Sequence, residues 1–452
     1  MSVTALVNRQ RAYFRAGATL SVASRKKALN ALLRQVTLRE GTLLAALRAD
    51  LGKASCEGYM TEVGLVKDEI RYHLKHLDRW AKDSPCHTPL AQFPGKSWTH
   101  PEPYGVTLIM APWNYPVLLS LDPLVGALSA GNCAVLKPSA YAPATSRALA
   151  ELIAAALPPE LAAVVEGGRA ENQSLLEEHF DYIFFTGSPE VGRYVMEKAS
   201  RHLTPVTLEL GGKSPCIVTS SADLKVAARR IVFGKLVNAG QTCVAPDYLL
   251  VHTSVKDHLI PLLEKEVRTF LGDDPLNNPE YPKIINQKHY DRLLGLLEEG
   301  ELRFGGQAGN GRIAPTLVDG ITPDSPVMQE EIFGPILPIL TYHDLDEVVD
   351  FVQSRPKPLA LYLFTRKKSE EQTILSRLSF GGGCVNDTLV HLASPHMPFG
   401  GVGESGMGGY HGKFSFDTFS HQKSVLKRFA KPDIPLRYAP YDGKMKWIKT
   451  LL

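Results

Sequence analysis

Short apolar segments alternate with helical ones along the middle of this chain. The apolar segments lie at 105–111, 133–137, 162–166, 182–186, 206–210, 215–219 and 248–252. Segments with helical periodicity fill most of the gaps, at 117–130, 143–157, 171–178, 189–200, 223–237 and 254–271. A strand that is apolar at every position is covered on both faces, and helices that follow each strand provide that cover in a parallel sheet. The alternation therefore predicts an α/β fold with parallel, doubly wound sheets.

The rest of the chain is less regular. Residues 21–80 are predicted to be helical, because apolar residues recur at helical spacing. Residues 83–103 contain five prolines and predict an irregular or extended connector, and the Gly/Asn-rich stretch 305–312 predicts a turn. After residue 380 the segments GGGCVND and PFGGVGESGMGGYHG are dense in glycine and predicted to be loops, and further strands are expected after residue 400. At roughly 150 residues per domain, 452 residues are enough for about three domain-sized units.

Charge, hydropathy and cysteine spacing exclude several functional classes. The net charge of +3 is far from the basic excess of a nucleic-acid-binding protein. No stretch approaches the ~20 apolar residues of a membrane span, and no apolar core typical of a secretory signal follows the N-terminal bases. The six cysteines are at least 27 residues apart, so we predict neither a C-x-x-C redox motif nor a metal site. We expect free thiols in a reducing compartment, the cytoplasm.

The first 39 residues carry an uneven charge. They contain eight Arg and Lys residues and no Asp or Glu. An acid-free, Arg-rich start is typical of a mitochondrial transit peptide, and it is equally typical of the basic outer face of an N-terminal helix.

Two patterns resemble phosphate-binding motifs but lack the context that such sites need. GVGESG (401–406) matches G-x-G-x-x-G, yet it follows Pro398-Phe399-Gly400 instead of a strand and continues into more glycine. GGKS (211–214) resembles the end of a P-loop, yet the position that must be glycine is Thr207. We predict no nucleotide site at either pattern.

Three residues combine catalytic chemistry with a suitable local setting. Cys243 lies in a glycine-led turn (240–246), where a thiol is reachable and can act as a nucleophile. Glu209 ends an apolar strand, where burial raises a carboxyl pKa toward that of a general base. Asn114, in the proline-stiffened turn APWNYP (111–116), offers a fixed N–H to an oxyanion. The alternatives are a structural thiol, a strand-end ion pair and an asparagine that satisfies its own turn.

Two further turns suit a nucleotide. KPSA (137–140) ends a strand, and FFTGSPEVG (184–192) crosses a strand-to-helix turn. Ligands of α/β sheets bind at the carboxyl ends of strands, and helix N-termini bind anions such as pyrophosphate. Ordinary loop chemistry explains either turn alone equally well. Taken with the three residues above, the set suits acyl chemistry through a thioester beside a nucleotide.

These segments, in their order and spacing, resemble the aldehyde dehydrogenase superfamily. The resemblance covers roughly residues 20–430 and also includes EEIFGP (330–335). The form of the cysteine motif, GQTCVAPDY, and the segments VNDTLVH and PFGGVGESGMGGYHG resemble the class 3 branch of fatty and aromatic aldehyde dehydrogenases. The resemblance implies a homodimer that oxidises medium-chain, long-chain or aromatic aldehydes to carboxylic acids with NAD or NADP.

The resemblance also implies a role for each matching residue. Cys243 would be the nucleophile, Asn114 and the Cys243 backbone N–H the oxyanion hole, and Glu209 the base that activates water. The implied cofactor-binding residues are Lys137, Gly187, Gly192, Glu331 and Phe333. The implied aldehyde-pocket residues are Tyr59, Tyr115 and Phe233, each of which is equally well explained as a core aromatic.

One position departs from the family pattern. The family motif is K-P-S-E, and its glutamate contacts the adenosine ribose, whereas this chain has Ala140 there. Alanine cannot repel a 2′-phosphate, and Lys137 remains to pair with one. We therefore predict that NADP is used at least as well as NAD.

The resemblance implies two Rossmann-like domains and a small β oligomerisation element. The expected division is an NAD(P)-binding domain with N-terminal helices (1–80 and 98–209), a catalytic domain (210–390), an oligomerisation element (81–97 and 391–434) and a tail (435–452). On this division the basic N-terminal segment is a solvated helix face that meets an acidic surface, and it is part of the folded body, not a removable leader. The tail is too short and too basic to span a membrane, and we expect it to be solvated.

Three other functions remain as alternatives. An acylating relative would pass the thioester to coenzyme A, but a base such as Glu209 favours water. A cysteine hydrolase without redox chemistry would not need the phosphate-type turns or Lys137. A non-catalytic structural protein would not need Cys243, Asn114 and Glu331 together.

Overall fold

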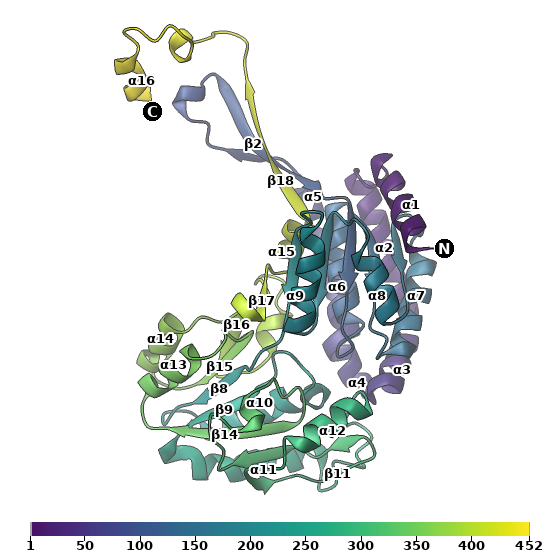
Figure 1. Ribbon diagram of the computed structural model, residues 1–452, viewed down its shortest axis with the longest axis vertical. Helices are drawn as coiled ribbons and strands as arrows, with labels where there is room; N and C mark the ends of the chain where they lie inside the picture. Colours follow the sequence, from purple (N-terminus) through teal and green to yellow (C-terminus); the bar gives the residue numbers. More distant parts are fainter. Residues whose placement is uncertain (1, 452) are drawn as a thin grey trace.

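The computed structural model describes residues 2–451 and consists of two α/β bodies and a projecting arm (Figure 1). Each body is built on a largely parallel sheet that is covered by helices, with one further strand in antiparallel orientation at an edge. The α/β class predicted from the alternating pattern is therefore confirmed.

The first body is organised around a six-stranded sheet in the order β17-β7-β6-β3-β4-β5. Its strands are β3 (Val106–Met110), β4 (Cys133–Lys137), β5 (Ala162–Val164), β6 (Tyr182–Thr186), β7 (Val206–Glu209) and β17 (Gly406–Met407). Its crossover helices are α6 (Leu118–Ala130), α7 (Pro143–Ala156), α8 (Arg169–Leu176) and α9 (Pro189–Ser200). Strands β3, β4 and β6 are buried at every residue, which explains why their sequences are almost wholly apolar.

The N-terminal helices pack beside this sheet. They are α1 (Val3–Arg15), α2 (Val22–Leu38), α3 (Glu40–Leu51), α4 (Ser55–Gly58) and α5 (Gly64–Trp80), with the π-helical turn η1 (Tyr59–Val63) between the last two. One basic residue of α1 is tied to the sheet of this body, since Arg11 forms an ion pair of 3.1 Å with Asp181. The expectation of a solvated basic face does not hold for Arg25, which is buried and donates to the carbonyl oxygen of Thr19 at 2.9 Å.

The second body is organised around a seven-stranded sheet in the order β10-β13-β14-β9-β8-β15-β16. Its strands are β8 (Pro215–Val218), β9 (Tyr248–His252), β10 (Glu301–Phe304), β13 (Thr316–Asp319), β14 (Ile336–Tyr342), β15 (Ala360–Phe364) and β16 (Gly382–Val385). Its helices are α10 (Leu224–Leu236), α11 (Lys256–Leu271), α12 (Gln287–Gly295), α13 (Leu345–Gln353) and α14 (Lys368–Arg377). The stretch expected to be only a turn holds a small hairpin of β11 (Ala308–Gly309) and β12 (Arg312–Ile313).

A three-stranded sheet in the order β1-β2-β18 forms the arm, which extends away from both bodies (Figure 1). The strands are β1 (Ser84–Cys86), β2 (Gly95–Pro103) and β18 (Ser420–Arg428), and β18 pairs with β2 over the full length of both. The proline-rich connector is thus partly a β-ribbon. Because β2 runs through the boundary expected at 97–98, residues 98–103 belong to the arm and not to the first body. Strand β17, expected in the arm element, instead completes the six-stranded sheet.

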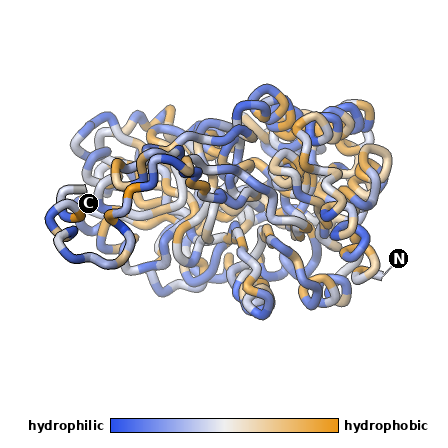
Figure 2. The backbone as a smooth tube through the Cα atoms, turned by 90° about the horizontal axis from the view of Figure 1, so that it is seen from above, coloured by the Kyte–Doolittle hydropathy of each residue, from blue (hydrophilic) through white to orange (hydrophobic). Residues whose placement is uncertain are grey.

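The remaining helices are α15 (Lys413–Thr418), which packs on α6, and the short C-terminal α16 (Met445–Leu451). The chain near its C-terminus is drawn mainly in blue and white in Figure 2, and Trp447 is 64% exposed. None of the helices within residues 2–451 is both long and apolar enough to cross a membrane. The same residues contain no cluster of three His, Cys, Asp or Glu side chains that is arranged to hold a metal ion.

Candidate active site

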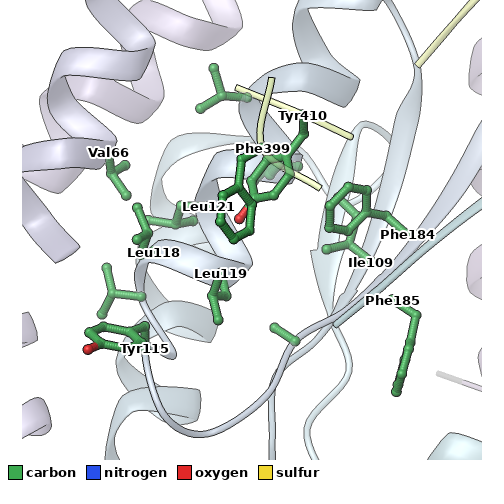
Figure 3. Close-up of a cluster of buried hydrophobic side chains, with 14 of the residues drawn as sticks. Val66, Ile109, Tyr115, Leu118, Leu119, Leu121, Phe184, Phe185, Phe399 and Tyr410 are labelled. Atoms are coloured by element: carbon green, nitrogen blue, oxygen red, sulfur yellow. The ribbon is translucent and has the colours of Figure 1, made fainter. Parts of the chain in front are cut away.

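A cavity of about 210 Å³ lies between the two bodies and contains Cys243 in its wall. Its walls come from η1, α5 and α6 of the first body, from α10 and the Cys243 loop, and from the C-terminal chain after β16. Most of the lining side chains are apolar, including Leu65, Leu118, Leu119, Phe233, Val237, Leu389, Phe399 and Tyr410. Figure 3 shows Phe399 and Tyr410 lying close to the leucines of α6.

Cys243 follows α10 through a strained turn. The turn η3 (Val237–Gly240) has positive φ angles at Asn238 (54°) and Gly240 (74°). A Cβ atom at Gly240 would lie 2.3 Å from the carbonyl oxygen of Gly334, so only glycine fits where this turn crosses the EEIFGP loop. Backbone strain of this kind is concentrated at functional sites. Here it places the half-buried Cys243 in the cavity wall.

The surroundings of Cys243 disfavour a thiolate at rest. Burial raises the pKa of this thiol well above its usual range, and the carboxylates of Glu331 and Glu209 raise it further. The thiolate is the nucleophilic form of cysteine. Any nucleophilic role therefore requires that a base remove the thiol proton as the bond forms.

Asn114 lies beside the cysteine loop. Its side chain is 2% exposed, and its Nδ2 donates to the carbonyl oxygen of Gln241 at 3.1 Å. The backbone carbonyl oxygen of Asn114 accepts from Asn238 Nδ2 at 2.8 Å and from Lys53 Nζ at 3.3 Å. A primary amide has two N–H donors, so the second remains free for another acceptor.

A buried ion pair supports the loop that carries Asn114. Lys53 Nζ and Glu62 Oε1 are 2.6 Å apart, and both side chains are fully buried. Glu62 Oε2 accepts from the backbone N–H of Val117 at 2.8 Å, and Lys53 Nζ lies 4.2 Å from the centre of the Tyr115 ring. Glu62 belongs to the π-helical turn η1, a distortion that often marks functional sites. The pair therefore contacts the loop at Asn114 and again just before α6.

Glu209 lies at the end of β7, and its side chain has no partner. It is 2% exposed, and neither carboxylate oxygen has a hydrogen bond within residues 2–451. Burial raises the pKa of Glu209 well above its usual range. The GVGESG pattern and the Gly400 before it pack around Glu209, since Gly406 pairs with Glu209 in the sheet and a Cβ at Gly400 would lie 3.1 Å from Glu209 Oε1. This pattern thus forms the wall of the Glu209 site, not a βα nucleotide turn.

A second cavity, of about 250 Å³, is lined by Glu331, Gly211, Gly212 and Pro189, the first residue of α9. Glu331 Oε1 is buried without a partner, and burial together with Asp247 raises the pKa of Glu331 to about 8. A Cβ at Gly211 would lie 2.0 Å from Glu331 Oε2, so glycine is needed for this approach. The free Glu331 oxygen can accept from the hydroxyls of a dinucleotide, and the helix N-terminus beside it suits the phosphates.

Three of the expected cofactor-binding residues lie at the carboxyl ends of the strands of the first body. Lys137 ends β4, is buried, and donates to the carbonyl oxygen of Gly167 at 2.6 Å. Gly187 lies in the turn after β6, and its N–H donates to the carbonyl oxygen of Glu209 at 3.0 Å. A Cβ at Gly192, in the first turn of α9, would lie 2.7 Å from the Leu210 side chain. The sheet therefore brings these separate motifs to one edge.

Phe333 connects this edge to the Asn114 loop. Its ring centre is 5.3 Å from that of Trp113, in an edge-on arrangement. Its φ of 51° is unusual for a residue with a side chain and marks a sharp bend in the EEIFGP loop. The EEIFGP loop therefore contacts the Asn114 loop through Phe333 and Trp113, and the Cys243 turn through Gly334.

Two of the three expected pocket aromatics line the first cavity. Tyr115 and Phe233 contribute to its wall, and the Tyr115 hydroxyl is 2.6 Å from Thr242 Oγ1. Tyr59 does not line this cavity. It is 42% exposed and lies against Lys67, because the π-helical turn points Glu62 inward and leaves Tyr59 on the outer side.

Sequence reasoning missed several residues around the site. They are Lys53, Glu62, Phe399, Tyr410 and His411. A lysine and a glutamate nine residues apart in a helical region give no signal of burial. Phe399, Tyr410 and His411 lie in a glycine-dense segment that was expected to serve only oligomerisation. The aromatic residues among these glycines were the one signal in the sequence that this segment packs closely.

The comparisons with known proteins decide the family. Residues 1–425 match the model of the aldehyde dehydrogenase family. The chain belongs to this family. A curated relative from Staphylococcus aureus, 4,4′-diaponeurosporen-aldehyde dehydrogenase, is 50% identical over 97% of both chains. Aldehyde dehydrogenase family 3 member H1 from Arabidopsis thaliana is 47% identical over 99% of this chain and 94% of its own length.

Solved structures of aldehyde dehydrogenases share the fold. The substrate-bound state of Staphylococcus aureus AldH superposes with a TM-score of 0.98 at 48% identity, and covers 100% of this chain and 99% of that one. The NAD-dependent aldehyde dehydrogenase from Sinorhizobium meliloti superposes with a TM-score of 0.86 at 30% identity over 95% of this chain and 87% of that one. The expected family and class 3 resemblance are confirmed. This aldehyde dehydrogenase oxidises aldehydes to carboxylic acids with a nicotinamide cofactor.

Proposed function

We propose that this aldehyde dehydrogenase acts on medium-chain, long-chain or aromatic aldehydes through a covalent thioester on Cys243. The observation that carries the substrate class is the apolar lining of the cavity beside Cys243. Burial of apolar surface contributes roughly 25 cal/mol per Å², so a long alkyl chain or an aromatic ring binds there better than a short hydrophilic chain. The relative from Staphylococcus aureus, named for 4,4′-diaponeurosporen-aldehyde, supports this class.

The first chemical step forms a bond between Cys243 Sγ and the aldehyde carbon. A base accepts the thiol proton as the bond forms, and the carbonyl oxygen of the aldehyde becomes an oxyanion. The free N–H of the Asn114 amide and the backbone N–H of Cys243 stabilise this oxygen. The product of the step is a thiohemiacetal on Cys243.

NAD or NADP, when bound, supplies the hydride acceptor. The residues that suit this group are Lys137 at the end of β4, Gly187 and Gly192 around the start of α9, and Glu331 with Phe333 in the EEIFGP loop. The unpartnered Glu331 Oε1 and the glycines beside it support this assignment. After oxidation the acyl group is held on Cys243 as a thioester.

Glu209 completes the reaction as the base for thioester hydrolysis. It removes a proton from water, the hydroxide attacks the acyl carbon, and the carbon–sulfur bond breaks to release the acid and free Cys243. The partnerless carboxylate in the same cavity wall as Cys243 supports this role. The same feature argues against coenzyme A as the acyl acceptor, because a base next to the thioester favours water.

A panel of aldehydes with both cofactors tests the proposed function. Short semialdehydes, straight-chain alkanals of increasing length and aromatic aldehydes are compared by the absorbance of the reduced cofactor, with and without coenzyme A. We expect kcat/KM to rise with apolar chain length and coenzyme A to have no effect. Activity confined to short hydrophilic aldehydes contradicts the substrate class, and acyl transfer to coenzyme A contradicts hydrolysis.

Substitution of Ala140 is expected to change cofactor preference. Ala140 is exposed just after β4, close in sequence to the buried Lys137. The wild type should use NADP at least as well as NAD, and Ala140→Glu should lower kcat/KM for NADP about tenfold relative to NAD, because a carboxylate repels the 2′-phosphate. Ala140→Gln is the matched uncharged control. A strong NAD preference in the wild type that Ala140→Glu does not increase contradicts the prediction.

Glu209→Gln is expected to stop the reaction after oxidation. Because the pKa of Glu209 is raised, its basic form and the hydrolysis rate increase with pH until that pKa is passed. The variant should lose this rise and slow hydrolysis by about 10²–10⁴-fold. A burst of reduced cofactor and an acyl-enzyme in the mass spectrum are the direct measurements.

The Tm of Glu209→Gln serves as a control for its folding. A buried carboxyl with a raised pKa stabilises the fold only at low pH, and this stability is lost as pH rises above the usual carboxyl range. Glu209→Gln should therefore raise the Tm at neutral pH while slowing turnover. A variant that keeps its Tm but accumulates no acyl-enzyme contradicts the assigned role as a base, whereas a lower Tm shows that the substitution has damaged the fold.

We further propose that two chains associate through the arm, as the class 3 resemblance implies. Strand β18 is an edge strand of the three-stranded sheet, and Leu426 on it is 44% exposed. Edge strands that extend from a protein body present unpaired backbone groups, which a second chain can cover. The cytoplasm remains the expected compartment, from the free cysteines.

A further inference from the structure

A third cavity, of about 360 Å³, adjoins the one that contains Cys243. The two share the side chains of Leu65, Leu118, Leu392, Ala393 and His411. Beyond this common wall, the third cavity is lined by polar and charged groups of α5 and α6, among them Glu69, Tyr72 and Asp122. The apolar substrate cavity therefore has a polar neighbour on one side, which the reaction described above does not use.

Two buried polar groups face each other in this polar region without a partner. His411 Nε2 and Asp122 Oδ2 are 4.0 Å apart, and the two residues are 7% and 4% exposed. His411 Nε2 and Asp122 Oδ1 have no hydrogen bond within residues 2–451. A separation of 4.0 Å is too long for a hydrogen bond, and buried polar atoms without a partner are costly. One oxygen atom placed beside the line between them would satisfy both groups.

The protonation of the two groups makes them a donor and an acceptor. Burial raises the pKa of Asp122 well above its usual range, and the charge of Glu69 raises it further, which favours the protonated carboxyl, the form that can donate. Burial lowers the pKa of His411 to about 4, so its ring is neutral. His411 Nε2 has no hydrogen bond within residues 2–451, and it is an acceptor in the tautomer that carries its proton on Nδ1.

The backbone holds His411 in this position under strain. Its φ is 83°, which is rare for a residue with a side chain. The N–H of the next residue, Gly412, donates to Glu69 Oε1 at 2.6 Å, and the same oxygen is 3.0 Å from His73 Nε2. Phe399 stacks on the His411 ring at 5.4 Å. Glu69 therefore fixes the segment and is itself satisfied, whereas His411 and Asp122 are not.

We propose that Asp122 and His411 form a subsite that binds a hydroxyl group on the hydrocarbon chain of the aldehyde. The hydroxyl donates its hydrogen to His411 Nε2 and accepts from the Asp122 carboxyl. An unsubstituted chain leaves both groups unsatisfied. This inference rests on the proposed function, because it requires that the chain of the aldehyde occupy the cavity beside Cys243. It adds a preference for hydroxylated long-chain aldehydes over the parent alkanals.

The test is a series of isomeric hydroxyalkanals of one chain length, with the hydroxyl at successive carbons, compared with the parent alkanal. One position, or two adjacent ones, should have a kcat/KM about tenfold above that of the parent, because the hydroxyl bonds to both groups while giving up its bonds to water; tenfold corresponds to about 1.4 kcal/mol. Other positions should fall below the parent. Turnover of the parent alkanal tests the proposed function separately from the subsite.

Variants locate the effect. Asp122→Leu and His411→Phe should each remove the preference, and Asp122→Asn should keep part of it because an amide can still donate. The readout is the ratio of hydroxyalkanal to alkanal kcat/KM, so a general loss of activity cancels. Asp78→Asn, at an exposed carboxylate of α5 outside the three cavities described above, is the matched control and should leave the ratio unchanged.

The outcomes separate clearly. A position-dependent preference that both Asp122→Leu and His411→Phe remove supports the subsite. Equal or lower kcat/KM for every hydroxyl position in the wild type overturns it, as does a preference that persists in both variants. If the variants do not fold, the wild-type series alone decides, because the proposal requires one favoured position.

Discussion

Cys243→Ala is expected to lower kcat for aldehyde oxidation by about 10⁶-fold, the scale on which an enzyme that works through a covalent intermediate loses activity without its nucleophile. The substitution removes the only atom of the cavity wall to which the acyl group is proposed to bond. Reduced-cofactor absorbance with a long-chain aldehyde measures the loss. Because Cys243 is half-buried and alanine is only slightly smaller, the fold and the Tm should change little.

Cys384→Ala is the matched control for this experiment. Cys384 is likewise half-buried and lies in β16, with its sulfur 3.5 Å from His391 Nδ1. We expect this variant to keep its aldehyde oxidation and, like Cys243→Ala, to keep its Tm. Substantial activity in Cys243→Ala, or equal losses in both variants, would show that the covalent mechanism is assigned to the wrong thiol.

Lys53→Met is expected to cost about 3–5 kcal/mol of unfolding free energy, because it leaves the Glu62 carboxylate buried without its partner. It should also lower kcat, since Lys53 Nζ donates to the carbonyl oxygen of Asn114 and holds the loop that carries the proposed oxyanion donor. Urea unfolding measures the first effect, and steady-state kinetics with a saturating aldehyde measures the second.

A cycle with Asn114→Ala separates positioning from general instability. Asn114→Ala alone should lower kcat by about 10²–10³-fold, as for loss of one oxyanion donor. If Lys53 acts through Asn114, adding Lys53→Met to Asn114→Ala should lower kcat little further, although stability still falls. The surface pair of Lys26 and Asp78 gives the control, because Lys26→Met should change stability by less than about 1 kcal/mol. Fully additive losses of kcat contradict the positioning role.

Regular local patterns were sufficient to predict most of the fold. The segments CAVLK and YIFFT become β4 and β6 with the predicted bounds, and α9 begins and ends as expected, because each carries a local signal such as an apolar run or a helix-starting Pro189. The connector 83–103 and the segment around Gly406 were predicted less well. Their strands have few apolar residues and exist because distant strands pair with them.

The residues of the candidate site likewise fall into those that local sequence signals revealed and those that they did not. Cys243, Glu209 and Asn114 were selected from their own turns and strand ends, and the structure places them around one cavity or beside it. Lys53 and Glu62 carry no local sign of burial, because lysine and glutamate are normally exposed. Tyr59 and Glu62 lie three residues apart, and only the π-helical turn decides that the glutamate points inward and the tyrosine outward.

The amino-acid sequence by itself determined the α/β class, the family and the chemical groups at the ends of the strands, because these depend on local periodicity and on motifs of a few adjacent residues. The tertiary structure alone decided which distant groups meet. It paired Lys53 with Glu62, packed glycines on Glu209, and set His411 opposite Asp122. Burial and partnership set the pKa and the energetic cost of such groups, and both arise only when segments far apart in the chain pack together.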